Sequence, residues 1–145
     1  MFRGISGKKV LVTGASGGIG SQIAALFSSG GAVVGVHYYR NRESAAGLVK
    51  QIEEDGGTAS LFQADLADQP AHNTLIPDFL SRFGHIDVLV NNAGANLGNI
   101  HFLDLEPSSW ERTFNLNCAA PFFLARQAFQ QMASHGGGRI INITS

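Results

Sequence analysis

The fold of this chain is decided near its amino end by Lys8-Lys9-Val10-Leu11-Val12-Thr13-Gly14-Ala15-Ser16-Gly17-Gly18-Ile19-Gly20. The run at 8–13 is apolar and predicts a buried strand, and the apolar spacing over 19–29 predicts a helix after the glycines. A strand, a glycine-rich turn and a helix in this order present backbone N–H groups to a phosphate at the amino end of the helix. The stretch therefore predicts a nucleotide-binding turn. The alternative is a plain glycine-rich turn between a strand and a helix.

The glycines of this turn have different expected tasks. Gly14 is expected to make the turn, Gly18 to let a diphosphate approach the backbone, and Gly20 to let helix and strand pack closely. Ser16 offers a hydroxyl to a phosphate or a ribose, and Ile19 belongs to the same cofactor-binding loop. No Gly-Lys-Ser/Thr ending follows, so a kinase-type phosphate loop is disfavoured.

Outward from this turn, apolar strand-like runs alternate with helical ones. Nearly continuous apolar strands are typical of a buried parallel sheet, and its crossovers are right-handed. We therefore expect an α/β fold, a Rossmann-type doubly wound parallel sheet with strand order 3-2-1-4-5. Residues 1–145 would be one incomplete domain that stops after the fifth strand. Further strands are expected at 32–39, 58–63, 86–90 and 139–144, and helices at 43–54, 70–82 and 108–134, the last distorted by Pro121.

Composition excludes several classes of function. The net charge of −1 offers no polybasic face for nucleic acid, and no run of about 18 apolar residues spans a membrane. The single Cys118 allows neither an internal disulfide nor a multi-thiolate metal site, and we expect it to be a small buried hydrophobe. We expect a soluble, cytoplasmic protein without a metal.

The end of the second strand bears on which dinucleotide would bind. A fold that takes NAD usually places an acid there for the ribose 2′-hydroxyl, but no carboxylate precedes Glu43. Arg40 or Arg42 could instead meet a 2′-phosphate, and Tyr38 or Tyr39 could lie against the adenine. We therefore expect NADP(H) rather than NAD(H). The alternative is that both arginines are solvated loop residues.

Two further motifs follow the third and fourth strands: Asp65-Leu66 and Asn91-Asn92-Ala93-Gly94. Together with the glycine pattern over 13–20 they resemble the short-chain dehydrogenase/reductase family, from about residue 8 to residue 145. The general make-up is most similar to bacterial 3-oxoacyl-carrier-protein reductases. The resemblance implies that Asp65 and Leu66 flank the adenine. It also implies that Asn92, Ala93 and Gly94 line the ribose side of the cofactor and brace the sheet.

The same resemblance implies an activity: hydride exchange between a nicotinamide and a small-molecule carbonyl or alcohol. It assigns a catalytic role to Asn117, in the segment 110–117, and a substrate hydrogen bond to Ser145. Asn117 could equally be a core amide whose hydrogen bonds are all made within the protein. The match of Ser145 to the substrate-binding position could be an accident of where the chain is truncated. The last helix, around 108–134, would join a second copy of the chain in a homo-oligomer, or simply pack in the core.

One expected pair is absent from the sequence. Members of the family carry Tyr-x-x-x-Lys just downstream of the serine, where the lysine lowers the pKa of the tyrosine. The only tyrosines here are Tyr38 and Tyr39, and neither has a lysine four residues on. We expect the amino-terminal portion of a reductase, inactive alone. The alternatives are a dinucleotide-binding or interaction module without catalysis and a different Rossmann-type enzyme, which the motifs disfavour.

Overall fold

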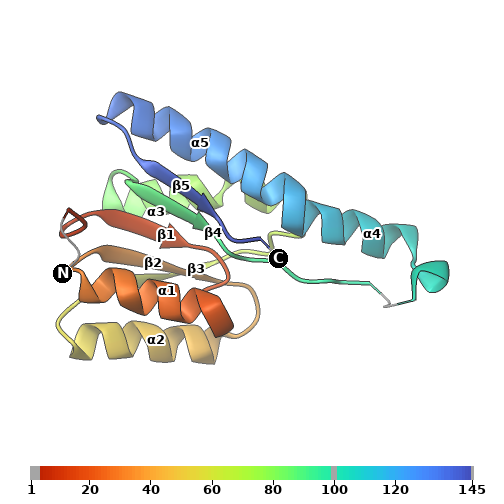
Figure 1. The fold of residues 1–145 in the computed structure, drawn as a ribbon, viewed down its shortest axis with the longest axis horizontal. Helices are drawn as coiled ribbons and strands as arrows, with labels where there is room; N and C mark the ends of the chain where they lie inside the picture. The colour runs from red at the N-terminus through yellow and green to blue at the C-terminus, as the bar shows by residue number, and fades with distance from the viewer. Residues whose placement is uncertain (1–3, 99–100, 145) are drawn as a thin grey trace.

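The computed structural model describes residues 4–98 and 101–144, which form a layered α/β fold (Figure 1). Parallel strands build one sheet in the order β3-β2-β1-β4-β5, which confirms the predicted fold class and strand order. The strands are β1 Lys9–Val12, β2 Val33–Tyr38, β3 Thr58–Gln63, β4 Val88–Asn91 and β5 Arg139–Asn142.

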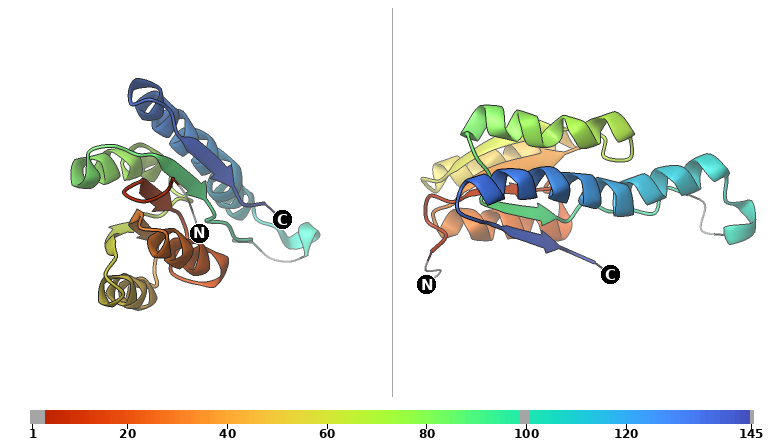
Figure 2. Two further views of the ribbon diagram at one scale, coloured as in Figure 1. Left: turned by 60° about the vertical axis from the view of Figure 1, so that its left-hand side comes forward. Right: turned by 90° about the horizontal axis from the view of Figure 1, so that it is seen from above.

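Helices cover both faces of the sheet. On one face lie α1 (Gly18–Ser29) and α2 (Arg42–Glu54), and on the other α3 (Leu75–Phe83) and α5 (Ala120–Ser134) (Figures 1 and 2). The carboxyl ends of the strands point towards the side where α4 (Pro107–Phe114) extends beyond the sheet (Figure 1). Within the described residues, no helix is both long enough and apolar enough to cross a membrane.

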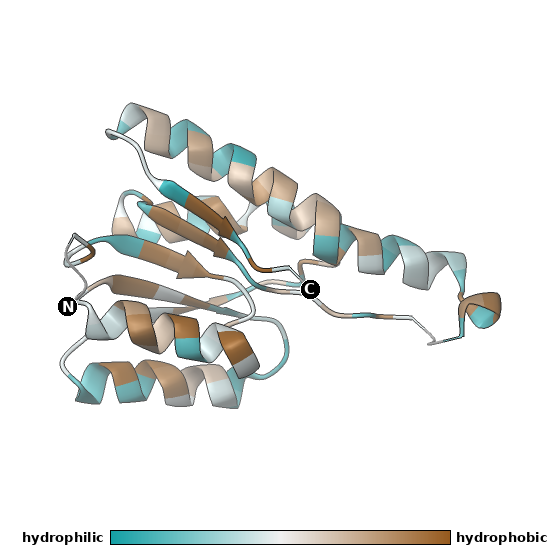
Figure 3. Cartoon of the chain, viewed as in Figure 1, coloured by the Kyte–Doolittle hydropathy of each residue, from teal (hydrophilic) through white to brown (hydrophobic). Residues whose placement is uncertain are grey.

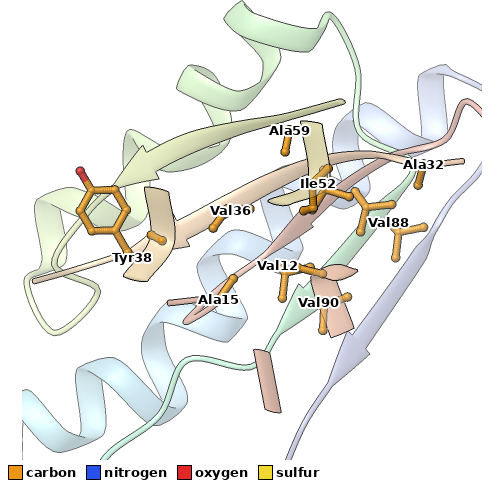
Figure 4. Close-up of a cluster of buried hydrophobic side chains, with 13 residues drawn as sticks. Val12, Ala15, Ala32, Val36, Tyr38, Ile52, Ala59, Val88 and Val90 are labelled. Atoms are coloured by element: carbon orange, nitrogen blue, oxygen red, sulfur yellow. The ribbon is translucent and has the colours of Figure 1, made fainter. Parts of the chain in front are cut away.

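The core has two halves, one on each face of the apolar strands (Figure 3). Val12 pairs with Val36 on one side and Val90 on the other, so the three side chains share the α1/α2 face, as Figure 4 shows. Leu11 and Leu89 point to the opposite face, where Phe79 of α3 is also fully buried. Each such side chain contributes about 1.5–3 kcal/mol when buried, so the alternation along the strands holds both helix layers in place.

The helix predicted over 70–82 is two elements, which corrects that prediction. A 3₁₀ helix, η1, covers Gln69–Asn73, and α3 begins only at Leu75. The ring of His72 explains the tighter turn, because its Nε2 lies 2.8 Å from the carbonyl oxygen of Leu66 and the side chain is buried. Gly84 ends α3 with a φ of 86°, as its place just past the predicted end suggested.

The long predicted helix, 108–134, is interrupted at its middle. Between α4 and α5 lies a π-helical turn, η3, over Asn115–Ala119, in which the N–H of Ala120 donates to the carbonyl of Asn115. Pro121 is the second residue of α5 and has no N–H for the carbonyl four residues earlier, that of Asn117. The predicted distortion is therefore confirmed, and it takes the form of a widened turn just before the proline.

Candidate functional site

A cleft of about 870 Å³ opens at the carboxyl ends of β1, β2 and β3. Its wall includes the residues that the sequence predicted for cofactor binding, except Gly20, which is buried, and the two alternatives Tyr38 and Arg42. The predicted residues that line the cleft are Gly14, Ser16, Gly18, Ile19, Tyr39, Arg40, Asp65, Leu66, Asn92, Ala93 and Gly94.

The glycine loop has the tight geometry that its spacing predicts. Gly14 has a φ of 64°, and a Cβ there would lie 2.8 Å from the Cα of Ala93. A Cβ on Gly20 would lie 2.3 Å from the carbonyl oxygen of Gly14, so the helix packs on the loop only without a side chain. Gly18 has a φ of 53°, but a Cβ there meets no atom within 4 Å. Gly14 and Gly20 therefore fix the conformation of the loop, and Gly18 leaves its outer surface without a side chain.

The amino end of α1 suits an anion. Its N-cap, Gly17, has an extended backbone and makes no side-chain capping bond, and no acidic residue lies in the first turn. N–H groups of a first turn have no partner within the helix and carry the positive end of its dipole. A Cβ at Gly17 would also meet no atom within 4 Å, so no side chain fills the space in front of these donors. The loop therefore fits the diphosphate of a dinucleotide.

His37 of β2 holds this loop from behind, a role that sequence reasoning missed. Its Nδ1 accepts from the N–H of Gly14 at 3.0 Å, so the ring proton is on Nε2, which donates to the carbonyl of Ala64 at 3.1 Å. Burial lowers the pKa of His37 to about 4, against the opposing effect of the Ala64 hydrogen bond. A lone histidine inside an apolar strand was the available sequence signal.

Thr13 and Asn92 join the ends of β1 and β4. The hydroxyl of Thr13 accepts from the backbone N–H groups of Asn92 and Ala93, both at 3.0 Å. The amide of Asn92 donates to the carbonyls of Thr13 at 3.0 Å and Gly14 at 3.2 Å. The amide of Asn91 donates to Oδ1 of Asn142 on β5 at 2.9 Å. The Asn-Asn pair thus ties the central strands to each other beside the cleft.

Tyr39 and Arg40 form the wall of the cleft at the end of β2. The Arg40 guanidinium donates to the Tyr39 hydroxyl at 3.3 Å and lies 4.8 Å from the centre of that ring. Tyr38 is 8% exposed and packs in the core, so of the two tyrosines only Tyr39 faces the cleft. Arg42 is the first residue of α2 and does not line the cleft. Of Arg40 and Arg42, only Arg40 therefore faces the cleft.

Asp65 follows β3 and lines the same end of the cleft. Its Oδ1 accepts from the N–H of Ala67 at 3.0 Å and its Oδ2 from Nη2 of Arg112 at 2.9 Å. Burial alone raises the pKa of the Asp65 carboxyl, but these hydrogen bonds outweigh it and leave the pKa below its ordinary value. Arg112, whose own pKa the Asp65 carboxylate raises, comes from α4 and was not singled out in the sequence.

A second cleft, of about 820 Å³, adjoins the first and shares the wall Ile19 and 92–95. Asn117 lines it, and the side chain is exposed rather than a buried core amide. Its amide donates at 2.7 Å to the carbonyls of Ala95 and Thr113, and its Oδ1 accepts from the N–H of Ala95 at 3.2 Å. Asn117 therefore holds the loop after β4 against the π turn.

Two further predictions concern this region. Cys118 was expected to be buried, but it is exposed and lines the second cleft, because it lies about half a helical turn away from Ala120, which packs on the sheet. Ser145, the predicted substrate contact, lies outside the described residues. Within the described ranges, no group of three His, Cys, Asp or Glu residues could hold a metal ion.

Comparison with known proteins agrees with this geometry. Versicolorin reductase 1 of Aspergillus parasiticus is 39% identical over 142 residues, which are 97% of this chain and 53% of that protein. The 3-oxoacyl-[acyl-carrier-protein] reductase FabG of Staphylococcus aureus is 36% identical over 138 residues, 95% of this chain and 56% of that reductase. The chain thus spans about half the length of the curated relatives it matches.

A solved structure and a family profile extend the match. The structure of a metagenomic short-chain oxidoreductase in complex with NADP is 35% identical, with a TM-score of 0.90 over 97% of this chain and 62% of that one. The profile of the family described as short chain dehydrogenase matches residues 8–145. The glycine loop, the Asn-Asn brace and the strand order therefore have one explanation: this chain belongs to the short-chain dehydrogenase/reductase family.

Proposed function

We propose that the protein exchanges a hydride between NADP(H) and a small-molecule carbonyl or secondary alcohol, an activity that needs more residues than this chain contains. The observation that carries the proposal is the pair of adjoining clefts, with the bare amino end of α1 in the first and Asn117 in the second. The nicotinamide supplies or takes the hydride. The chain itself binds and orients the dinucleotide.

The preference for NADP(H) over NAD(H) rests on the charges at the end of β2. Among the ion pairs of the described residues none involves Arg40, and the only carboxylate in the cleft wall, Asp65, is paired with Arg112. A ribose 2′-phosphate at this place would therefore meet a guanidinium with no competing anion. A 2′-hydroxyl would find no acid at the end of the strand.

Titration calorimetry with NADPH and NADH tests this preference. We expect Arg40→Ala to weaken NADPH binding by about 10- to 100-fold, the worth of one lost charge-assisted hydrogen bond, and to leave NADH binding nearly unchanged. Arg42→Ala is the matched control, because that side chain lies outside the cleft wall. An unchanged NADPH/NADH affinity ratio in the double variant Arg40→Ala plus Arg42→Ala would overturn the assignment.

The remaining residues of the site have proposed tasks along the dinucleotide. Asp65 and Leu66 would flank the adenine, and Gly14, Ser16, Gly18 and Ile19 would surround the diphosphate. Asn92, Ala93 and Gly94 would lie beside the ribose next to the nicotinamide, and Ser145 would bind the substrate oxygen. All of these except Ser145, which the structure does not describe, line the first cleft. Gly20 would act indirectly, by keeping the loop and α1 together.

The main task of the Asn117 side chain would be to hold neighbouring backbone in place. Its side chain is already bonded to Ala95 and Thr113, which leaves little capacity for a substrate. Its backbone carbonyl, in contrast, has no i+4 donor because residue 121 is proline. We place the contribution of Asn117 in holding the wall of the second cleft and in offering this carbonyl to a proton-carrying water.

A specific observation favours a second function for these 145 residues alone: dinucleotide binding without turnover. Tyr38 is buried and Tyr39 lies beside Arg40, so neither tyrosine lines the second cleft. We expect the chain to bind NADPH in calorimetry yet to show no ketone-dependent oxidation of NADPH. Turnover by the 145-residue chain would contradict this. Failure to bind either nucleotide while folded would contradict the cleft assignment itself.

A second copy of the chain is the proposed macromolecular partner. Large apolar side chains on α4 and α5 face solvent: Trp110 is 62% exposed, Phe122 62% and Phe129 64%. Exposed large apolar side chains on neighbouring helices are typical of a protein interface, which supports a homo-oligomer through residues 108–134.

A further inference from the structure

Arg112 crosses the cleft at the end that we assign to the adenine. It comes from α4, 47 residues after its partner Asp65, and its Nη2 lies 2.9 Å from Oδ2 of that carboxylate. Both side chains line the cleft. We propose that Arg112 is a positioning residue for the nucleotide base: it fixes the Asp65 carboxylate so that an oxygen of Asp65 accepts a hydrogen bond from the exocyclic amino group of adenine. This inference rests on the proposed function.

The carboxylate of Asp65 is fixed at two points. The N–H of Ala67 donates to Oδ1 at 3.0 Å and Arg112 donates to Oδ2, so the group cannot rotate without losing a bond. Tyr39, which lines the same cleft, also lowers the pKa of the carboxyl. Each carboxylate oxygen can accept two hydrogen bonds. Asp65 therefore has acceptor capacity left for a ligand, in an orientation that the protein sets beforehand.

A contribution to the stability of the fold does not account for the ion pair between Arg112 and Asp65. The Arg112 side chain is 44% exposed, and exposed ion pairs contribute little to stability. No residue of α4 is buried, so the helix has no core to which the arginine would need to anchor it. The pair instead connects α4 with the turn after β3 beside the cleft.

The chemistry of the base edge then decides selectivity. Adenine presents an amino group at position 6, which donates, whereas hypoxanthine presents a carbonyl oxygen, which accepts. A fixed carboxylate that only accepts favours the first and repels the second. A free carboxylate could turn away from the carbonyl and discriminate less. Arg112 thus increases the selectivity for adenine over hypoxanthine that the Asp65 carboxylate provides.

The test compares the binding of NADPH with that of its hypoxanthine analogue, which carries a carbonyl oxygen at position 6 and a proton on the neighbouring N1. We expect the wild-type chain to prefer NADPH by at least about tenfold, the size of one hydrogen bond to a charged group. Arg112→Met should bring the ratio of the two dissociation constants close to one, and Arg112→Lys should restore part of it. Arg126→Met is the matched control, because that guanidinium lies 5.1 Å from the centre of the Phe123 ring and outside the cleft wall.

The possible results distinguish a failure of the Arg112 proposal from a failure of the proposed nucleotide binding. If Arg112→Met weakens both nucleotides equally, or neither, Arg112 has a structural role or none and the inference is overturned. If the folded wild-type chain binds neither nucleotide, the proposed function fails and the inference fails with it. Thermal unfolding of each variant establishes that it is folded, and Asp65→Asn, which can both donate and accept, should lose the preference even if Arg112→Met does not fold.

Discussion

At the level of single residues, the glycine loop is held by side-chain hydrogen bonds from β2 and from the turn after β4. His37 accepts from the N–H of Gly14, and the amide of Asn92 donates to the carbonyls of Thr13 and Gly14. These bonds fix the loop from the protein side. The donors at the start of α1 stay directed at the cleft, because neither Gly17 nor Gly18 carries a side chain that could shield them.

Gly20 gives the sharpest prediction at this scale. Gly20→Ala would place a Cβ 2.3 Å from the carbonyl oxygen of Gly14 and 2.5 Å from Nδ2 of Asn92. We expect a loss of about 1–3 kcal/mol in the free energy of unfolding, as for other overpacked sites, together with weaker NADPH binding. Denaturant unfolding measures the first and calorimetry the second.

Gly47→Ala is the matched control for this substitution. Gly47 lies in the middle of α2, and a Cβ there meets no atom within 4 Å. We expect it to raise the free energy of unfolding by about 0.5–1 kcal/mol without altering nucleotide binding. Equal effects of the two alanines on stability would contradict the close packing of Gly20.

His37 predicts how stability depends on pH. Its pKa in the folded chain is about 4, whereas the unfolded chain binds the proton near the ordinary value of 6.5. The unfolded state therefore binds more protons between these values, so stability is full above pH 6.5 and falls as the pH is lowered towards 4. At about 1.4 kcal/mol per pKa unit, the loss approaches about 3 kcal/mol.

Urea unfolding at a series of pH values checks this prediction. We expect His37→Asn, which does not titrate, to flatten the curve between pH 6.5 and 4, and His135→Asn on the surface to leave the slope unchanged. The carboxyls of Asp65 and Asp87 have lowered pKa values and act only below their ordinary value of 3.8. A slope that persists in His37→Asn would show that another group is responsible.

At the level of elements, the π turn between α4 and α5 forms part of the wall of the second cleft. It carries Asn117 and Cys118 to the cleft wall while Ala120 and Leu124 remain buried against the sheet. A regular helix through 115–119 would change the rotation of α4 relative to α5. Asn117 couples this turn to the loop after β4, where a Cβ on Gly94 would lie 2.8 Å from its Oδ1.

Asn117→Ala should loosen that loop without unfolding the chain. The substitution removes both bonds to the backbone of Ala95, and exposed hydrogen bonds contribute about 0.5–1.5 kcal/mol each. We expect faster amide hydrogen exchange at Ala95, with little change at β1 or β2. Asn96→Ala is the control, since that side chain accepts from the N–H of Gly98 within the same loop. Unaltered exchange at Ala95 would rule out the coupling.

At the level of the whole molecule, the helices leave the α1/α2 face of the sheet partly uncovered over β5. Val90 of β4 is 1% exposed on the α1/α2 face, but its register partner Ile141 on β5 is 39% exposed. Phe122 and Phe129 likewise leave apolar surface open on the outer side of α5. Part of the apolar surface of this chain is therefore not covered by its own helices and strands.

The proposed homo-oligomer is testable at this scale. We expect the chain to sediment as a dimer or larger at micromolar concentration, and Phe122→Glu plus Phe129→Glu to shift it to a monomer, because charged side chains would have to be desolvated in the interface. Phe102→Glu is the control: this side chain is 79% exposed and lies off the α4–α5 face, in the short 3₁₀ helix η2, Phe102–Asp104. A wild-type monomer, or an unchanged mass in the double variant, would contradict the proposal.

The sequence by itself determined the fold class and the strand order, and the residues that it predicted for cofactor binding make up about half of the wall of the first cleft. Apolar periodicity and glycine spacing are local signals, and the handedness of crossovers turns them into one sheet order. The carboxyl ends of parallel strands then meet at one edge, so the predicted residues after β1, β3 and β4 had to converge.

Only the tertiary structure decided which partners these residues have. Asp65 and Arg112 are 47 positions apart, and Gly14 and His37 are 23 apart, so no local period connects them. In the structure Arg40 lines the cleft and Arg42 does not, and Cys118 is exposed. The helix predicted over 70–82 is two elements. Each of these depends on how side chains pack between elements, and that packing is settled only when the elements come together.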